Sequence, residues 1–233
     1  MMKKAIIFLF LPLLASNILT GQGTVKETRN VNGFTNVNFG ISGNLYIRQG
    51  SEYRLEIEGS RSVLDEIETE VSGGRLMIRR DSWHFSLRDE QVTVNITMPE
   101  LEGLSVSGSG KAEVYEFSGL DDLELNVSGS GKILVNRLKA DDLSCVISGS
   151  GDILLKGEGS ADRGEISISG SGSYRGEEVQ IDRISARLSG SGTCYCKAGS
   201  SLEAAVSGSG SIYYSGNPSV DARVSGSGSV RKR

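Results

Sequence analysis

The feature that most constrains the fold is the tetrapeptide Ser-Gly-Ser-Gly, which recurs through the second half of the chain. Apolar residues stand one, three and five positions before nearly every copy, and the residues between them are mostly polar. A period of two is typical of a strand with one buried face, so each copy is expected to end a strand. The copies lie about 20 residues apart and begin at Ser107, Ser128, Ser148, Ser169, Ser189, Ser207 and Ser225.

A second short alternating segment follows most copies, so each repeat predicts a strand, a corner, a strand and a loop. A hairpin with a two- or four-residue loop would place Val106 opposite Lys111 and mismatch the buried faces. A loop of odd length would remove this mismatch, so the constant spacing of the repeat decides between a hairpin and a solenoid. Identical corners can stack, with each strand pairing in parallel with its counterpart one repeat on. The sequence therefore predicts an all-β fold, a parallel β-helix (β-solenoid) with rungs of about 20 residues.

The corner glycines are the predicted structural residues of this solenoid. Stacked corners leave no room for a side chain, and glycine also adopts positive φ without penalty. The excess of glycine, 31 residues against 3 prolines, therefore indicates repetition and rigidity. The corner positions are Gly108, Gly110, Gly129, Gly131, Gly149, Gly151, Gly170, Gly172, Gly190, Gly192, Gly208, Gly210, Gly226 and Gly228.

The chain before residue 101 is less regular but still alternates. We interpret residues 22–100 as irregular first rungs of the same stack, followed by regular rungs over 101–233, so 22–233 form one domain. Ser42-Gly43-Asn44 and Ser72-Gly73-Gly74 resemble worn copies of the corner. Only Ser60 to Thr69 lacks alternation, and a helical turn is expected there.

The first residues predict export. Two lysines, a ten-residue apolar run and small residues after it form a secretory signal peptide over residues 1–21. The run is too short to span a membrane, and no later stretch reaches that length. The net charge of −4 argues against a nucleic-acid partner. We expect the chain in the periplasm, at the outer cell surface or secreted.

Little in the sequence predicts catalysis. The single histidine, His84, has no serine or cysteine nucleophile motif to accompany it. Cys194 and Cys196 lie two apart on one strand, too far for comfortable bridging, and Cys145 falls in another column. We expect three buried free thiols, no enzyme activity and no cofactor.

Acidic residues recur seven positions before the motifs, at Glu100, Asp121, Asp141, Asp162 and Asp182, with Asp122 and Asp142 beside two of them. Three interpretations stay open: solvated loop acids, a calcium site, or catalytic carboxylates of a carbohydrate-active β-helix enzyme. Ca²⁺ prefers hard oxygen ligands. Arg163 and Arg183 fall in the adjacent column and can neutralise the row. The weak calcium candidates are Asp121, Asp122, Asp141 and Asp142.

One outward column is unexpectedly apolar. The residues six positions after the start of each motif are Glu113, Leu134, Leu154, Arg175, Tyr195, Tyr213 and Arg231. Contiguous exposed apolar residues usually mark an interface. Leu134, Leu154, Tyr195 and Tyr213 are therefore predicted as the contact between copies in a homo-oligomer, or as an aromatic platform for a glycan. At the last rung, the charges of Arg231-Lys232-Arg233 are expected to discourage further strand addition.

Residues 34–47 (FTNVNFGISGNLYI), residues 92–110 (VTVNITMPELEGLSVSGSG) and the serial corners resemble the bacterial family called putative autotransporter adhesins with a head GIN domain. The resemblance covers essentially the whole mature chain. It implies a right-handed parallel β-helix, assembly as a trimer, export by Gram-negative bacteria of the Bacteroidota type and an adhesive role.

The resulting functional prediction is a non-catalytic exported surface or structural module that adheres to a glycan or a host or surface protein. Two alternatives are a polysaccharide lyase- or hydrolase-like β-helix enzyme and a periplasmic envelope scaffold.

Overall fold

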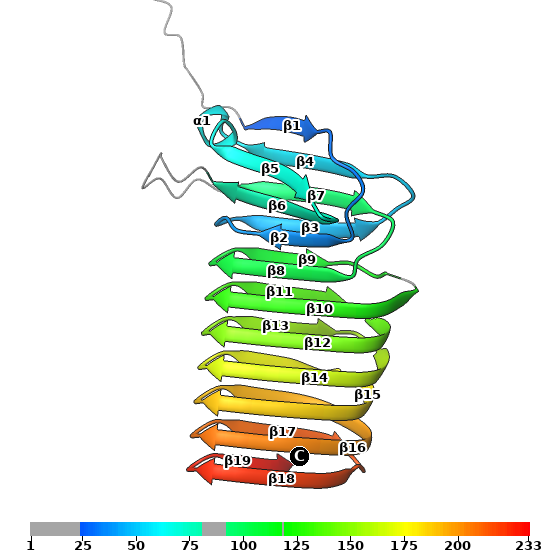
Figure 1. The fold of residues 1–233 in the computed structure, drawn as a ribbon, viewed down its shortest axis with the longest axis vertical. Helices are drawn as coiled ribbons and strands as arrows, with labels where there is room; N and C mark the ends of the chain where they lie inside the picture. Colours follow the sequence, from blue (N-terminus) through cyan, green and yellow to red (C-terminus); the bar gives the residue numbers. More distant parts are fainter. Residues whose placement is uncertain (1–23, 81–91, 118) are drawn as a thin grey trace, which may run out of the picture.

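The computed structural model describes residues 24–80, 92–117 and 119–233, which form a tall stack of strands (Figure 1). In the regular part, each rung contributes one strand to a front sheet and one to a back sheet. The front strands are β8 (Gly103–Gly108), β10 (Leu120–Gly129), β12 (Lys139–Gly149), β14 (Gly159–Gly170) and β18 (Ser219–Gly226). The back strands are β9 (Lys111–Val114), β11 (Lys132–Asn136), β13 (Asp152–Lys156), β17 (Ser211–Gly216) and β19 (Ser229–Lys232).

Two long strands, β15 (Ser173–Gly190) and β16 (Thr193–Gly208), run from the back sheet into the front sheet. Each strand pairs in parallel with its counterpart one rung on, and the corners stay in register, so that Gly129 pairs with Gly149 and Gly149 with Gly170. The predicted β-solenoid is therefore confirmed.

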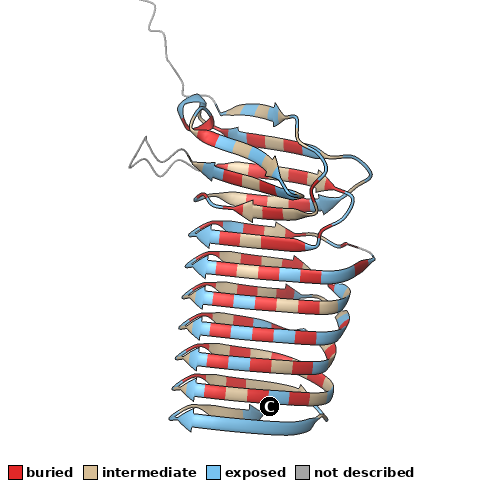
Figure 2. Ribbon diagram, viewed as in Figure 1, coloured by how far each residue is buried: buried red, intermediate tan, exposed pale blue. Residues whose placement is uncertain are grey.

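The core lies between the two sheets and is built from the alternating inward positions. Leu125, Cys145 and Ile166 occupy one inward column and are at most 1% exposed. Figure 2 shows the same alternation of buried and exposed positions along each front strand. Burying one such aliphatic side chain contributes about 1.5–3 kcal/mol, so the stack is held by many equivalent layers.

The two glycines of each corner are required for different reasons. The first has positive φ, which is +118° at Gly149, and a Cβ there would lie 2.6 Å from the carbonyl oxygen of Gly129. The second lies over the corner below, and a Cβ on Gly151 would lie 2.5 Å from the carbonyl oxygen of Gly131. Close stacking of backbone on backbone therefore excludes side chains from these positions.

The N-terminal region continues the stack with two further parallel rungs. β2 (Asn36–Phe39) and β3 (Asn44–Gln49) pair with β8 and β9, and β6 (Arg75–Arg80) and β7 (Thr93–Met98) pair with β2 and β3 on the far side. Ser42-Gly43 forms the corner between β2 and β3, and the hydroxyls of Ser42 and Ser109 lie 2.9 Å apart. The first worn corner is therefore a true corner.

The other N-terminal strands depart from the expected pattern. β4 (Arg54–Gly59) pairs antiparallel with β1 (Val25–Arg29) and β7, and β5 (Ile67–Ser72) pairs antiparallel with β6. Our interpretation of these strands as rungs of one parallel stack is therefore wrong for β1, β4 and β5. The expected helical turn is α1 (Arg61–Leu64).

Ser72-Gly73-Gly74 is not a worn corner. It is the turn of the β5–β6 hairpin, where Gly73 and Gly74 have φ of +56° and +74°. Two successive positive φ values suit a tight hairpin whose twist matches that of its strands. The local sequence resembles a corner, but the chain reverses there instead of continuing into a parallel rung.

Gly149→Val is expected to destabilise the fold more than Gly108→Val. Both positions have positive φ, but a Cβ on Gly108 would meet nothing within 4 Å, whereas one on Gly149 meets the backbone of Gly129. The shared φ strain costs roughly 1–2 kcal/mol, and overpacking adds roughly 1–3 kcal/mol at Gly149 alone. Thermal melts followed by circular dichroism measure the difference. A Gly149→Val protein that melts at the wild-type temperature would contradict the stacked corner.

Candidate functional site

The predicted interface residues share one outward column of the back sheet. Parallel register joins Leu134 to Leu154 in neighbouring rungs and Tyr195 to Tyr213 two rungs further along, with Arg175 between the two pairs. The four predicted side chains are each half-buried. The structure thus brings them together as two pairs that an arginine separates.

The tyrosine pair is an internal stack. The rings of Tyr195 and Tyr213 are 5.1 Å apart with an interplanar angle of 13°, and the guanidinium groups of Arg175 and Arg233 lie 5.7 and 5.6 Å from the centre of the Tyr195 ring. Stacking and cation–π contact therefore engage the faces of the Tyr195 ring that a sugar would need, and stacking covers one face of Tyr213. Tyr195 offers a ligand mainly its edge and hydroxyl group.

The leucine pair forms the floor of a shallow groove of about 310 Å³. Lys111, Lys132 and Lys156 stand at its rim, beside Tyr46 and Glu113. Lys132 lies 3.8 Å from the carboxylate of Asp152. The groove combines an apolar floor with a cationic rim, which suits a ligand that is anionic and partly apolar.

Charge differs in sign between the two sheets. From β8 to β19, the outward positions of the front sheet carry six carboxylates and four arginines, whereas those of the back sheet carry six cations and three carboxylates. The back-sheet cations are Lys111, Lys132, Lys156, Arg175, Lys197 and Arg231. A chain with a net charge of −4 therefore has a positive face.

The acidic ladder lies where the chain turns into the front sheet. Asp121 and Asp122 are both exposed between buried Leu120 and Leu123, so the strand bends between them. Asp122 pairs with Asp142 in the next rung, and Asp142 pairs with Arg163 in the rung after it.

Arg163 binds Asp142 through two hydrogen bonds, from Nε and one terminal nitrogen to the two carboxylate oxygens. This guanidinium holds the pKa of Asp142 below its ordinary value, and the charge of Arg183 adds to the effect. Among the residues that the structure describes, no group of three or more histidine, cysteine or acidic side chains is arranged to hold a metal. Since Asp142 is already engaged, the calcium site gains no support from the geometry and stays a prediction.

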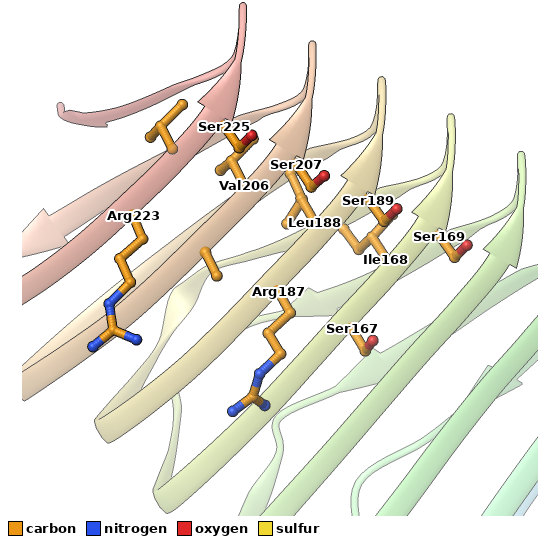
Figure 3. Close-up of a pocket in the computed structure, with 12 residues that line it drawn as sticks. Ser167, Ile168, Ser169, Arg187, Leu188, Ser189, Val206, Ser207, Arg223 and Ser225 are labelled. Atoms are coloured by element: carbon orange, nitrogen blue, oxygen red, sulfur yellow. The ribbon is translucent and has the colours of Figure 1, made fainter.

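The front sheet carries a second shallow groove, of about 450 Å³, that sequence reasoning did not single out. Figure 3 shows Ser169, Ser189, Ser207 and Ser225 following one another from strand to strand, with Arg187 and Arg223 on the same face. The signal was available, because these residues stand at fixed positions relative to each motif.

The three cysteines are buried and free, as the sequence predicts. Burial raises the pKa of the Cys145 thiol, and a hydrogen bond with Cys196, together with burial, raises that of Cys194. The thiols of Cys145 and Cys194 are therefore held in the unreactive protonated form. Tyr174, a fully buried neighbour in the same core, was missed, although its place in the alternation marks it as inward. His84 and the signal peptide over 1–21 lie outside the described residues.

These features define a class, a two-faced β-solenoid with a cationic back sheet. The chain belongs to the family described as putative auto-transporter adhesin, head GIN domain, whose model matches residues 33–218. The family predicted from the sequence is thus confirmed. No curated protein matches the chain. Within the described residues, no helix is long and apolar enough to cross a membrane.

Solved structures share the fold over almost the whole chain. A putative adhesin from Bacteroides fragilis NCTC 9343 has a TM-score of 0.83 at 26% identity, with 91% of this chain and 98% of that chain covered. A putative adhesin from Parabacteroides merdae ATCC 43184 has a TM-score of 0.71 at 23% identity, covering 92% and 97%. A putative lipid binding protein from Parabacteroides distasonis ATCC 8503 also has a TM-score of 0.71 at 23% identity, covering 91% and 98%.

Arg163→Gln is expected to raise the pKa of Asp142 towards its ordinary value, because the bidentate guanidinium is the main cause of its depression. A carboxyl group with a depressed pKa stabilises the fold above its unfolded pKa, and this contribution is lost as the pH falls through the folded pKa. NMR titration of the side-chain carboxyl carbon measures the midpoint. Arg187→Gln, which removes an arginine that does not contact Asp142, is the control. Equal midpoints in wild type and Arg163→Gln would refute the assignment.

Proposed function

We propose that this chain is a non-catalytic, exported surface module that adheres to an anionic glycan through its back sheet. The observation that carries the proposal is the excess of six cations over three carboxylates on that sheet in a chain whose net charge is −4. A face of one sign raises the local concentration of ligands of the opposite sign and speeds their encounter. Export rests on the signal pattern of residues 1–21.

The groove at Leu134 and Leu154 gives the face its chemical preference. A uronic acid or sulfated sugar has both an anionic group and an apolar C–H face, which match the lysine rim and the leucine floor. Lys111 and Lys156 make no ion pair within the described part of the chain, so their charges are available to a ligand. The solenoid presents these side chains from paired strands, so little ordering is needed on binding.

The similarity to a putative adhesin from Bacteroides fragilis and membership of the putative auto-transporter adhesin family support the proposal of adhesion. A homo-oligomer contact through the leucine and tyrosine column is the alternative use of this surface, because it would cover the groove at Leu134 and Leu154. Light scattering on wild type and on Leu134→Lys/Leu154→Lys tests it. The first alternative is a β-helix enzyme, which would release sugars from a polysaccharide and lose this activity in Asp141→Asn. The second is a periplasmic envelope scaffold, for which cell fractionation would find the protein in the periplasm.

Lys111→Glu/Lys156→Glu is expected to weaken binding to heparin or polygalacturonate about tenfold, because two rim cations become anions. Arg183→Glu/Arg187→Glu, the same charge change on the front sheet, is the matched control. Immobilised heparin, polygalacturonate and neutral dextran are compared at about 0.15 M salt, where exposed charges more than about 8 Å apart are screened.

Equal losses of affinity in both double variants would show that binding depends on net charge alone. This result would overturn the assignment of the binding site to the back sheet. Binding only to vesicles of phosphatidylglycerol would replace the glycan by a lipid surface. Binding to no polyanion at all would also reject the proposal.

A further inference from the structure

The last rung of the described structure leaves an edge of the front sheet open. β18 pairs with β16 on one side, and within the described residues it has no partner on the other. Its inward residues Val220 and Val224 are 39% and 46% exposed, whereas Leu202 and Val206, their counterparts one rung earlier, are 1% and 3% exposed. Figure 2 shows β18 exposed along its whole length. Core-type side chains thus meet solvent beside an unpaired strand.

The register tells which backbone groups face this open edge. In a parallel ladder, successive residues direct their amides to alternate neighbours. Glu124 donates its N–H to the carbonyl oxygen of Glu102 in the preceding rung, and Asp221 lies in the same column as Glu124. The backbone N–H and C=O groups of Asp221 and Arg223 therefore point towards β16. Those of the inward residues Val220, Ala222 and Val224 point to the open edge.

The sequence of this strand is complementary to itself. Residues 219–225 read Ser-Val-Asp-Ala-Arg-Val-Ser, which is symmetric about Ala222 except that opposite charges stand at Asp221 and Arg223. An antiparallel pair of two such strands centred on Ala222 sets Val220 opposite Val224 and Asp221 opposite Arg223. The first pair exchanges backbone hydrogen bonds. The second is a non-hydrogen-bonded pair, in which side chains approach most closely.

The charge complementarity belongs to the edge rung and not to the repeat. The equivalent positions of the interior rungs hold no pair of opposite charges; they are Glu124 and Asn126, Ser144 and Val146, Glu165 and Ser167, Ser185 and Arg187, and Glu203 and Ala205. Interior rungs are covered on both sides and have no free edge to pair. Among the described strands of the front sheet from β8 to β18, only β18 combines a free edge with opposite charges at these two positions.

We propose that two copies of this chain join end to end through β18, antiparallel about a two-fold axis at Ala222. The contact is isologous, so it closes at two copies. It adds about six backbone hydrogen bonds between the copies. Val220, Ala222 and Val224 become interior. Asp221 and Arg223, which form an ion pair of 3.1 Å with each other in the single copy, each meet the opposite charge of the other copy.

This two-fold axis is perpendicular to the front sheet, because opposite residues of an antiparallel pair direct their side chains to the same face of the sheet. Both back sheets therefore lie on one side of the dimer. If the back sheet binds glycan, as proposed above, the dimer would bind a polymeric ligand with two linked sites and gain avidity. The pairing itself does not depend on that function.

The back strand of the same rung opposes the pairing. Arg231, Lys232 and Arg233 repel their copies, and Lys232 is held by a hydrogen bond of 3.3 Å to Asn217. The expectation that these charges discourage strand addition thus applies to β19. It restricts the contact to the front strand and makes the dimer dependent on concentration.

Charge exchange tests the pairing. Asp221→Arg and Arg223→Asp each set like charges opposite one another, so each variant is expected to self-associate at least tenfold more weakly than wild type. The double variant Asp221→Arg/Arg223→Asp restores complementarity and is expected to dimerise again. An equimolar mixture of the two single variants is expected to form a heterodimer. The side chains of Asp221 and Arg223 are 63% and 76% exposed, so the fold tolerates these changes, which thermal melts verify.

Mass is measured by light scattering and sedimentation over micromolar to millimolar protein, without ligand. Glu165→Arg and Arg187→Asp, at the same column positions of interior rungs, are the matched controls and are expected to dimerise like wild type. Ala222→Cys, on the axis, is expected to cross-link under mild oxidation, because opposite Cα atoms about 5.5 Å apart suit a disulfide. Ala205→Cys, which faces outward one rung earlier, is expected to stay uncross-linked.

A wild type that stays monomeric throughout this range would overturn the proposal. So would single variants that dimerise like wild type, a mixture that stays monomeric, or an open-ended series of larger assemblies. Failure here would leave glycan binding by the back sheet untouched, because that test measures binding at one face of a single copy.

Discussion

The fold depends on the close contact of one corner backbone with the next. Ser150 donates its N–H to the carbonyl oxygen of Gly129 at 2.8 Å, and Asp152 donates to that of Gly131 at 3.0 Å. These bonds form only because no Cβ separates the corners. They fix the register at one end of every front strand and at the start of every back strand. A shift by one residue would turn each inward side chain to solvent, so the corners and the core specify the same register.

Because the register is fixed, residues one repeat apart along the chain align in columns across the rungs. The residue types in the outward columns can vary without destabilising the core. This freedom explains how cations gather on the back sheet and carboxylates on the front sheet. It also places Arg163 beside Asp142, so that an acidic ladder becomes an ion pair. Surface chemistry and fold are thus specified by alternate residues of the same strands. The face proposed to bind glycan and the edge proposed to pair lie on different parts of one stack.

Much of the fold could be predicted because the repeats carry it locally. The corners, the inward columns and the outward column through Leu134 and Tyr195 all follow from period-two alternation at constant spacing. The prediction failed at Ser72-Gly73-Gly74, where the same residue types form an antiparallel hairpin. A Ser-Gly turn permits either course, and the choice depends on which strand the following segment meets. The positions of the rungs relative to one another in the N-terminal region likewise do not follow chain order.

The sequence by itself determined which residues face inward, where the chain turns and that rungs stack, because alternation and glycine spacing are properties of neighbouring residues. The tertiary structure alone decided that Tyr195 and Tyr213 stack on each other and that, of the two arginines in the adjacent column, Arg163 binds Asp142. Each of these depends on residues about 20 positions apart along the chain. Parallel pairing brings such residues within one strand spacing, and only their rotamers and the order of the rungs decide what they contact.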